Sequence, residues 1–388
     1  MLCLGMTSAL AQITGSGYYR VMNQGTSRYV YVLDNSGSLD YLNQSADMGA
    51  IELWRDGATM NRLTNPATVI YYDRKQVVSE TEQRGDLAVQ GTSVYGIIGY
   101  YVNIKGSDAA NTYQVYASDR GITLYLDDET TSNTKDEGAV GTNRSGVYRL
   151  WKVYPLNNTE EYLGIEPSVT LGGKYYAPYY VSFPFTCYST GMKAYYISRI
   201  DAEHGLAVRA EVTGTVPAGA PVFVECASAD YSGNRITPVE TPTTKYSLPS
   251  ANVLKGVYFS NAYRPMNPES KTEYDKNTMR VLGVTSAGKL GFVTAADSQL
   301  NYFSNFKKYY LKANQSYLPV ESGSPAEFTI VDEDEYNDIV GIASILPDTE
   351  GAVVQGIYAP NGARLAAPAR GINIVKYSDG TVRKVYVK

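Results

Sequence analysis

The sequence is poor in the side chains that most enzymes use, beginning with histidine. Among 388 residues there is one histidine, His204, together with three cysteines and two tryptophans. One histidine cannot form a two-histidine zinc site, and any Ser-His-Asp or Cys-His arrangement would have to use His204. The chain also lacks a Gly-x-Ser-x-Gly elbow and the glycine motifs that bind phosphates or nicotinamide cofactors. We therefore expect a protein without catalytic activity, cofactor or bound metal.

Positive charge and long apolar runs are also scarce. The net charge is −5, which argues against nucleic acid as a partner because phosphate binding needs a basic surface. No segment approaches the length of apolar sequence that a transmembrane helix requires, so we expect no membrane span. Paired carboxylates need no sequence motif, and a glycoside hydrolase therefore stays open as the enzymatic alternative.

The first eleven residues have the features of a secretory signal peptide. Residues 2–10 form a short apolar run, and Ala9-Leu10-Ala11 fits the small-x-small pattern that signal peptidase recognises. Cleavage between Ala11 and Gln12 would make Gln12 the first residue of the mature chain. No lysine or arginine precedes the apolar run, which departs from the usual basic start. The expected location is secreted or at the outer cell surface.

Two cysteines remain after removal of this signal, Cys187 and Cys226. In an exported chain such a pair can form a disulfide, which would close a loop of about 40 residues and stabilise the fold by roughly 4 kcal/mol. Two buried free thiols are the alternative, because the sequence does not show whether the two Cα atoms come close enough to be bridged.

Tyrosine, in contrast, is abundant, with 36 Tyr against 8 Phe. Tyrosine suits a half-buried β-strand, where the ring packs and the hydroxyl stays wet. Short runs of β-branched and aromatic residues recur between clusters of Gly, Asn, Asp and Ser, and no long segment has a clear helical period. The sequence therefore predicts an all-β fold. Tyrosine rings left exposed would offer platforms for sugars or protein partners.

Residues 12–166 carry a weak internal repeat. The segments 19–21 and 113–115, and likewise Trp54 and Trp151, recur about 95 residues apart, which leaves room for a divergent middle unit around residues 68–99. Three such units are the plan of a β-trefoil, in which no unit can bury its apolar face alone. We expect the two tryptophans to be core anchors.

Residues 17–23 (GYYRVMN) together with Leu53-Trp54 resemble the ricin-type β-trefoil module of secreted bacterial proteins. The Gln-x-Trp signature of that module is absent, since Glu52 and Arg149 stand where Gln would be. The resemblance implies a sugar site with an aromatic face for stacking and an Asp or Asn fork for hydroxyls. If the aspartates are instead ordinary turn formers, no such site follows. The candidate ligand-binding residues are Asp34, Tyr41 and Asn43 in the first unit and Asp127 and Asp128 in the third.

Residues 167–331 resemble a β-sandwich module of surface proteins from Bacteroidetes-type bacteria. The shared features are an apolar-Pro-Phe strand at 183–185, an Ala-Tyr-Tyr strand at 194–196 and a late strand at 313–318 (ANQSYL). No defined activity accompanies this resemblance. An insertion-like loop falls at residues 261–276.

An acidic stretch follows at residues 332–345. It begins with Asp332-Glu-Asp-Glu335, with Asp338 close behind. We expect a solvated linker between domains. A calcium site is the alternative, although the spaced Asp-x-Asp-x-Asp-Gly loop is absent.

Residues 346–388 resemble the C-terminal sorting domain that the type IX secretion system recognises. The matching segments are 356–365, 368–375 and 383–388, and Asn373 stands where an aromatic residue is usual. The resemblance implies the secretion machinery as a partner and delivery across or onto the outer membrane. Together with the amino-terminal signal, it implies export in two steps.

These features predict a secreted or cell-surface binding protein that is not an enzyme and whose expected ligand is a glycan. The first alternative is a structural or adhesive surface protein that binds host or other surface proteins. The second is a glycoside hydrolase. An open aromatic groove with convergent Asp and Asn side chains on the first module would favour sugar binding, whereas two carboxylates about 5–10 Å apart in one cleft would favour hydrolysis.

Overall fold

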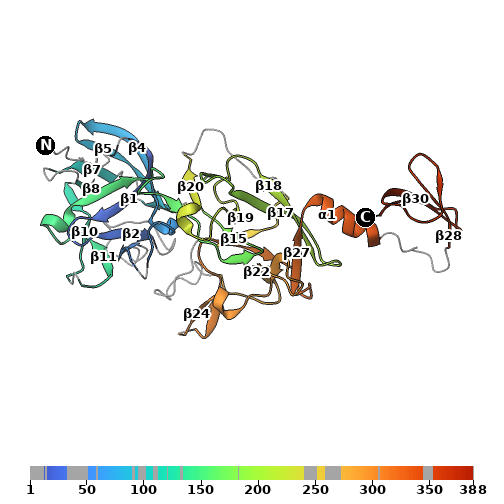
Figure 1. The fold of residues 1–388 in the computed structure, drawn as a ribbon. Coiled ribbons are helices and arrows are strands. Elements are labelled where there is room, and N and C mark those ends of the chain that lie inside the picture. Colours follow the sequence, from blue (N-terminus) through green and yellow to red (C-terminus); the bar gives the residue numbers. More distant parts are fainter. Residues whose placement is uncertain are drawn as a thin grey trace, which may run out of the picture.

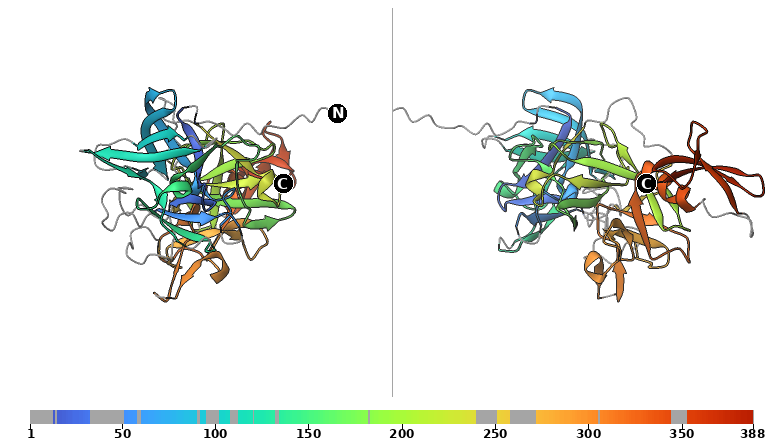
Figure 2. Two further views of the ribbon diagram at one scale, coloured as in Figure 1. Left: turned by 90° about the vertical axis from the view of Figure 1, so that its left-hand side faces the viewer. Right: turned by 45° about the vertical axis from the view of Figure 1, so that its right-hand side comes forward.

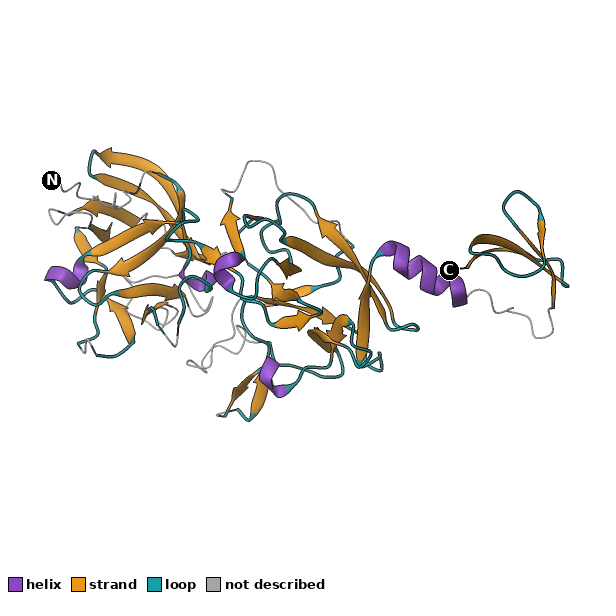
Figure 3. Ribbon diagram, in the orientation of Figure 1, coloured by secondary structure: helices purple, strands orange, loops and turns teal. Residues whose placement is uncertain are grey.

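A computed structural model shows a mostly β protein in three successive parts (Figures 1 and 3). A barrel module is followed by a central module, and the helix α1 (Glu333–Ala343) leads on to a small C-terminal sheet. Two further views show the same arrangement (Figure 2). The prediction of an all-β fold class is confirmed. The structure describes residues 13, 15–32, 51–57, 60–89, 92–94, 102–107, 112–119, 121–131, 134–181, 183–239, 251–257, 272–304, 306–343 and 353–387.

The first module is built around a closed ring of six antiparallel strands. β1 pairs with β12, and the ring continues through β8, β7, β5 and β4 back to β1. The ring strands are β1 (Gly17–Asn23), β4 (Ile70–Ser79), β5 (Glu82–Val89), β7 (Val102–Gly106), β8 (Tyr113–Asp119) and β12 (Trp151–Pro155). Strands that pair outside the ring are β2 (Arg28–Val32), β3 (Ile51–Arg55), β6 (Thr92–Val94), β9 (Ile122–Tyr125), β10 (Asp127–Asp128) and β11 (Glu137–Gly141).

The barrel core is anchored by Trp151, which is fully buried and donates from its indole Nε1 to the carbonyl of Leu126 at 3.0 Å. Trp54 is also buried, in a smaller cluster with Tyr29. The expectation that both tryptophans are core anchors is confirmed. The two repeat units nevertheless differ, because in the first unit Leu53 enters the main core and Trp54 does not. Neighbouring strand residues point to opposite faces, so a one-residue difference decides which side chain is inside.

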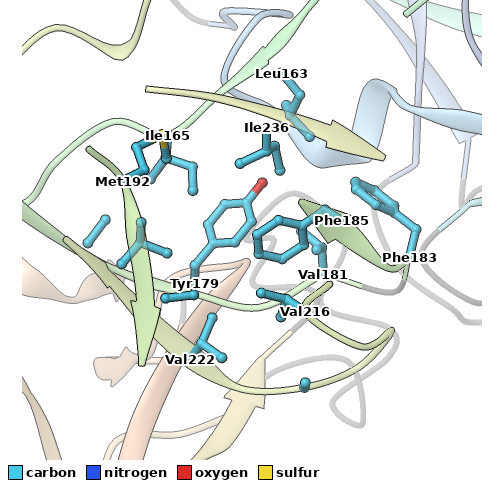
Figure 4. Close-up of a cluster of buried hydrophobic side chains, with 14 of the residues drawn as sticks. Leu163, Ile165, Tyr179, Val181, Phe183, Phe185, Met192, Val216, Val222 and Ile236 are labelled. Carbon is cyan, nitrogen blue, oxygen red and sulfur yellow. The ribbon is translucent and has the colours of Figure 1, made fainter. Parts of the chain in front are cut away.

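The barrel and central modules share one buried apolar cluster. Tyr18 and Val69 of the barrel pack with residues of the central module, and the rings of Tyr18 and Phe183 are 5.4 Å apart. Figure 4 shows the central-module part of this cluster around Tyr179. The Tyr179 hydroxyl has no hydrogen-bond partner among the described residues, and burial raises its pKa. The two modules are therefore joined through a common core.

A buried ionic network lies at the same junction. Arg20 is completely buried on β1, and its Nη1 donates to Glu161 Oε2 at 2.9 Å. Its other donors reach the Tyr162 carbonyl at 2.8 Å and Thr68 Oγ1 at 3.1 Å. Glu161 also pairs with Arg62 at 3.2 Å. One carboxylate thus neutralises a barrel arginine that is out of contact with water.

The central module contains one continuous sheet of ten strands in the order β14-β15-β19-β17-β18-β27-β23-β22-β26-β21. A three-stranded sheet, β13-β20-β16, and a hairpin, β24–β25, accompany it. The first strands are β13 (Leu163–Gly164), β14 (Val169–Leu171), β15 (Lys174–Tyr179), β16 (Phe185–Cys187), β17 (Lys193–Asp201), β18 (Leu206–Val212), β19 (Val222–Cys226) and β20 (Arg235–Pro238). The later strands are β21 (Lys255–Val257), β22 (Met279–Val284), β23 (Leu290–Val293), β24 (Asn301–Phe303), β25 (Lys308–Tyr310), β26 (Gln315–Pro319) and β27 (Glu327–Val331).

The ten-stranded sheet folds over on itself. β19 and β23 are not neighbours in the sheet, yet the rings of Phe223 on β19 and Phe292 on β23 lie 6.3 Å apart. Both side chains are fully buried in a cluster that also contains Ile197 and Phe328. The two halves of the sheet therefore enclose the main core of this module. β13 already pairs with β20, so the central module begins before residue 167.

The acidic stretch that we expected to be a solvated linker is a helix. Asp332 caps its start by accepting from the backbone N–H of Glu335 at 2.9 Å, and the acidic first turn suits the positive end of the helix dipole. Tyr336, Ile339 and Val340 form an apolar stripe that packs on β18 and β27. This i, i+3, i+4 spacing was present in the sequence but was hidden by the charged residues. Within the described ranges no helix is long and apolar enough to cross a membrane.

The C-terminal part is a four-stranded sheet in the order β29-β28-β30-β31. Its small core contains Val375, Tyr377 and Val385. Asn373, where the sorting-domain pattern has an aromatic residue, is fully buried and its side-chain Nδ2 donates to the carbonyls of Ala369 and Gly371. It therefore orders the turn before β30. The strands are β28 (Val354–Tyr358), β29 (Arg364–Leu365), β30 (Gly371–Tyr377) and β31 (Val382–Val387).

Candidate functional site

Most of the sequence-predicted site residues fall in segments that the structure does not describe. Asp34, Tyr41 and Asn43 of the first repeat unit lie outside the described residues, as do Ala11 and Gln12 at the expected cleavage point. The sugar site proposed for the first unit therefore stays a prediction.

The other two candidates, Asp127 and Asp128 on β10, are both completely buried. Asp128 forms an ion pair with Arg28 at 2.6 Å, and neither side chain is exposed. Asp127 Oδ2 accepts from the backbone N–H of Arg144 at 2.5 Å. Our interpretation of these carboxylates as a fork for sugar hydroxyls is not supported, because burial and internal partners keep them from a ligand. Sequence could not show this, since an Asp-Asp pair looks the same in a turn and in a core.

Asp127 is nevertheless unusual, because its Oδ1 is buried without a hydrogen-bond partner in the described part of the chain. Burial raises the pKa of its carboxyl from 3.8 to about 6. The folded protein therefore holds this proton more tightly than the unfolded chain does. Its contribution to stability is fully present below about pH 4, because both states are then protonated, and is lost as the pH rises through about 6.

We expect Asp127→Asn to change the pH dependence of stability. A shift of about two pKa units corresponds to roughly 3 kcal/mol, so the unfolding free energy of the variant should gain about that much relative to the wild type between pH 4 and pH 7. Urea unfolding at each pH, followed by tyrosine and tryptophan fluorescence, measures this difference. A constant difference between the two proteins across that range would contradict the raised pKa.

The two cysteines are free thiols in the structure. Of the two alternatives that the sequence left open, a disulfide and two free thiols, the structure has the free thiols. Cys187 is on β16 and Cys226 on β19, and both belong to the cluster at the module junction. Burial raises the pKa of the Cys187 thiol to about 11 and that of Cys226 to about 12. A thiol with so high a pKa is protonated at neutral pH and is a poor nucleophile.

His204 lies in the turn between β17 and β18, as its sequence context indicated. Its Nδ1 is 2.8 Å from Asp201 Oδ2, and the Tyr336 hydroxyl on α1 donates to the same oxygen at 3.1 Å. Asp201 thus joins the turn that contains His204 to α1. Over the described residues no group of three or more His, Cys, Asp or Glu side chains is placed to hold a metal ion.

Among the described residues, exposed aromatic side chains lie together on the β24–β25 hairpin, which projects from the central module (Figures 1 and 2). Tyr302 on β24 pairs directly with Tyr309 on β25, and their rings are 4.9 Å apart. Strand alternation places Phe303 and Tyr310 on the other face, where their rings are also 4.9 Å apart. The Phe306 ring lies 6.4 Å from that of Tyr310 and so belongs to this other face. We call the Tyr302 and Tyr309 side chains the aromatic hairpin surface.

Exposure differs strongly across this hairpin. Tyr302 is 53% exposed and Phe306 is 38% exposed, whereas Phe303 is only 8% exposed. Tyr309 packs partly against the small cluster of Leu300 and Leu311 beneath it. Tyr302 therefore rests on a ring that is fixed from below, and its outer surface is open to solvent. Exposed aromatic side chains of this kind are a feature of binding surfaces.

A carboxylate lies at the edge of the aromatic hairpin surface. The Tyr309 hydroxyl donates to Asp297 Oδ2 at 2.7 Å, and this hydrogen bond raises the pKa of Tyr309. Lys308 pairs with Glu273 at 2.6 Å on the opposite face, since Lys308 is the direct strand partner of Phe303. Lys307 has a left-handed backbone conformation, with φ of 53°, at the end of the connection between the strands. An aromatic ring beside a carboxylate can hold the apolar face of a sugar while a hydroxyl pairs with the carboxylate.

Sequence reasoning missed this surface although a signal was present. Residues 301–310 (NYFSNFKKYY) contain five aromatic residues, a density that suggests a cluster. Their exposure was not predictable, because the alternation of a short hairpin does not show which face the rest of the module covers.

The chain matches no known family model, no curated protein and no solved structure. A function must therefore be argued from its own residues.

Proposed function

We propose that this chain is a secreted or cell-surface binding protein, without enzymatic activity, that recognises glycans. The observation that carries the proposal is the aromatic hairpin surface, where the half-exposed Tyr302 lies against Tyr309 at 4.9 Å. A sugar ring has an apolar face of C–H groups, and a flat aromatic ring offers it contact without requiring a deep pocket. Asp297 supplies an acceptor for hydroxyls beside it.

The proposal includes finer assignments for the modules. The barrel is assigned to the β-trefoil class of ricin-type modules, which is supported by the six-stranded ring with hairpins β2–β3 and β10–β11 outside it. The central module is assigned as a β-sandwich, supported by the contact between Phe223 and Phe292 across its core. In this proposal residues 1–11 are a signal peptide, and residues 346–388 are recognised by type IX secretion machinery.

A glycan array screened with the full chain tests the function. We expect reproducible binding to a set of glycans, and Tyr302→Ala should weaken it about tenfold, which is the effect of losing roughly 1.4 kcal/mol of contact. The matched control is Tyr188→Ala, because Tyr188 is a similarly exposed tyrosine, at 57%, that is not part of the β24–β25 hairpin. That control should bind like the wild type.

Other results of the same screen would place the glycan site elsewhere or favour a different function. Loss of binding in Asp34→Ala with Tyr41→Ala, but not in Tyr302→Ala, would move the site to the first repeat unit of the barrel. Binding to no glycan would refute the glycan proposal. The exposed rings of Tyr302 and Phe306 would then favour the second candidate function, an adhesive or structural surface protein that binds other proteins.

A further inference from the structure

The C-terminal sheet is basic although the chain as a whole is acidic. Residues 353–387 contain five lysines and arginines and one aspartate, whereas the whole chain has a net charge of −5. The aspartate, Asp379, lies in the turn between β30 and β31, where it accepts from the backbone N–H and the hydroxyl of Thr381. The sheet is therefore a region of positive charge at one end of an otherwise acidic chain (Figure 1).

The register of the strands places three of these cations on one side of the sheet. Residues directly opposite each other in an antiparallel pair point to the same side. Across β29, β28, β30 and β31, one row of opposed residues is Arg364, Tyr358, Ile374 and Lys384. Lys376 is two residues along β30 from Ile374 and so points to the same side. Arg364, Lys376 and Lys384 are all exposed, and we call this side of the sheet the basic face.

Exposed apolar side chains lie among the cations of the basic face. Val382 lies opposite Lys376 and is 60% exposed, and Ile372 on β30 is 39% exposed on the same side. The Tyr358 ring lies along its own strand, since a Cβ added at Gly356 would meet it at 2.9 Å. The small core of the sheet is on the other side. The basic face thus combines separated cations with aliphatic surface that is open to solvent.

The spacing of the cations favours an extended anionic surface over a single small ion. Neighbouring strands are about 4.8 Å apart, so the backbones of Arg364 and Lys384, three strands apart, are separated by roughly 14 Å. The Tyr358 ring and the apolar side chain of Ile374 lie between them in the same row. Such an arrangement suits several separate anionic groups, each contacting one cation.

The exposed aliphatic side chains indicate which anionic surface fits. A nucleic acid or an acidic polysaccharide offers charge but no aliphatic region to Val382 and Ile372. A bilayer of anionic lipids offers both, because its acyl chains begin just below the charged headgroups. We propose that the basic face binds the surface of an anionic lipid membrane, with its cations at the headgroups and Val382 and Ile372 at the boundary of the acyl chains. This contact is separate from the glycan binding proposed above.

Flotation of the full chain with lipid vesicles tests this proposal. One set of vesicles is phosphatidylcholine alone, and the other mixes it with phosphatidylglycerol in a ratio of about 2 to 1. We expect binding to the anionic vesicles to be about 100-fold tighter, since each of three basic residues near such a surface contributes roughly fivefold. High salt should weaken this binding, because exposed charges are then screened. The apolar residues 2–10 are present in every variant, so the test depends on differences between vesicles and between variants.

Lys376→Gln together with Lys384→Gln should weaken binding to the anionic vesicles about 25-fold, because two cations of the basic face are lost. Both side chains are exposed, so the thermal midpoint should not change. The matched control is Lys255→Gln with Lys289→Gln, which removes the same charge from exposed positions of the central module and should bind like the wild type. Val382→Thr keeps the shape of the side chain but replaces a methyl group with a hydroxyl, and it should weaken binding about threefold.

Three results would overturn the proposal. Equal binding to the two kinds of vesicle would show that the cations do not recognise the headgroups. Wild-type binding by the Lys376→Gln, Lys384→Gln variant would place the membrane contact elsewhere on the chain. No binding to the anionic vesicles would exclude the membrane, and binding of dextran sulfate in its place would make the partner an acidic polysaccharide. Tyr302→Ala should leave vesicle binding unchanged, so failure of this proposal and failure of the glycan proposal are distinguishable.

Discussion

Replacing Glu161 with alanine is expected to lower the free energy of unfolding by about 3–5 kcal/mol, because it leaves a buried arginine without its counter-charge. Arg20 is completely buried and its closest acidic partner is Glu161, at 2.9 Å. The Tyr162 carbonyl and Thr68 hydroxyl keep their contacts with Arg20, but neither neutralises its charge. The same substitution removes a partner of Arg62.

The location of the network predicts a second effect of Glu161→Ala. Arg20 belongs to the barrel, and residues 161–162 lie at the start of the central module, next to β13. Losing the network should weaken the junction, so thermal unfolding followed by calorimetry should change from one transition to two. Glu160→Ala is the matched control, because the adjacent Glu160 is exposed, and it should change stability by less than about 0.5 kcal/mol. Equal stability of the two variants would show that the buried ion pair does not hold the junction.

The second large effect is expected from Asp128→Ala, which should destabilise the protein by about 3–5 kcal/mol. Asp128 and Arg28 form an ion pair in which neither side chain is exposed. Arg28 also donates to the Lys135 carbonyl at 2.7 Å, so it is held in place and would keep its charge inside the barrel module. A Cβ at Gly138 would meet Arg28 Cδ at 2.9 Å, which shows how closely the chain packs around this pair.

Urea unfolding distinguishes this structural role from the ligand-binding role that the sequence suggested. The control is Asp136→Ala, since Asp136 is an exposed carboxylate just before β11 of the same hairpin, and it should be neutral within about 0.5 kcal/mol. The double variant Arg28→Met with Asp128→Leu should recover much of the loss, because no unpaired charge remains buried. If Asp128→Ala kept its stability and instead lost glycan binding, the ligand-binding role would be restored.

Several features of the fold were predictable because they depend on local chemistry. Strand-forming runs between Gly, Asn and Asp clusters indicate strands wherever they lie in the chain. Trp54 and Trp151 were expected in the core because large aromatic side chains lose most by exposure, and both are buried. His204 was placed at a turn from the Asp, Glu and Gly residues around it, and the turn joins β17 to β18.

The candidate site and the polar core were not predictable in the same way. An aspartate beside another aspartate gives no indication of whether it meets water or an arginine that comes from 100 residues away, as Arg28 does for Asp128. The sequence also did not predict helix α1. Its charged residues are typical of a linker, whereas the helix is stabilised by the packing of Tyr336 and Ile339 on β18 and β27.

The sequence by itself determined the β class of this protein, its scarcity of catalytic side chains and the turn at His204, since each depends on residue type and spacing over a few positions. Only the tertiary structure decided which polar groups are buried in pairs, that Arg364 and Lys384 share one face of a sheet, and that Tyr302 remains open to solvent. Those outcomes depend on contacts between distant segments, whose energies are set by burial and geometry that no local pattern contains.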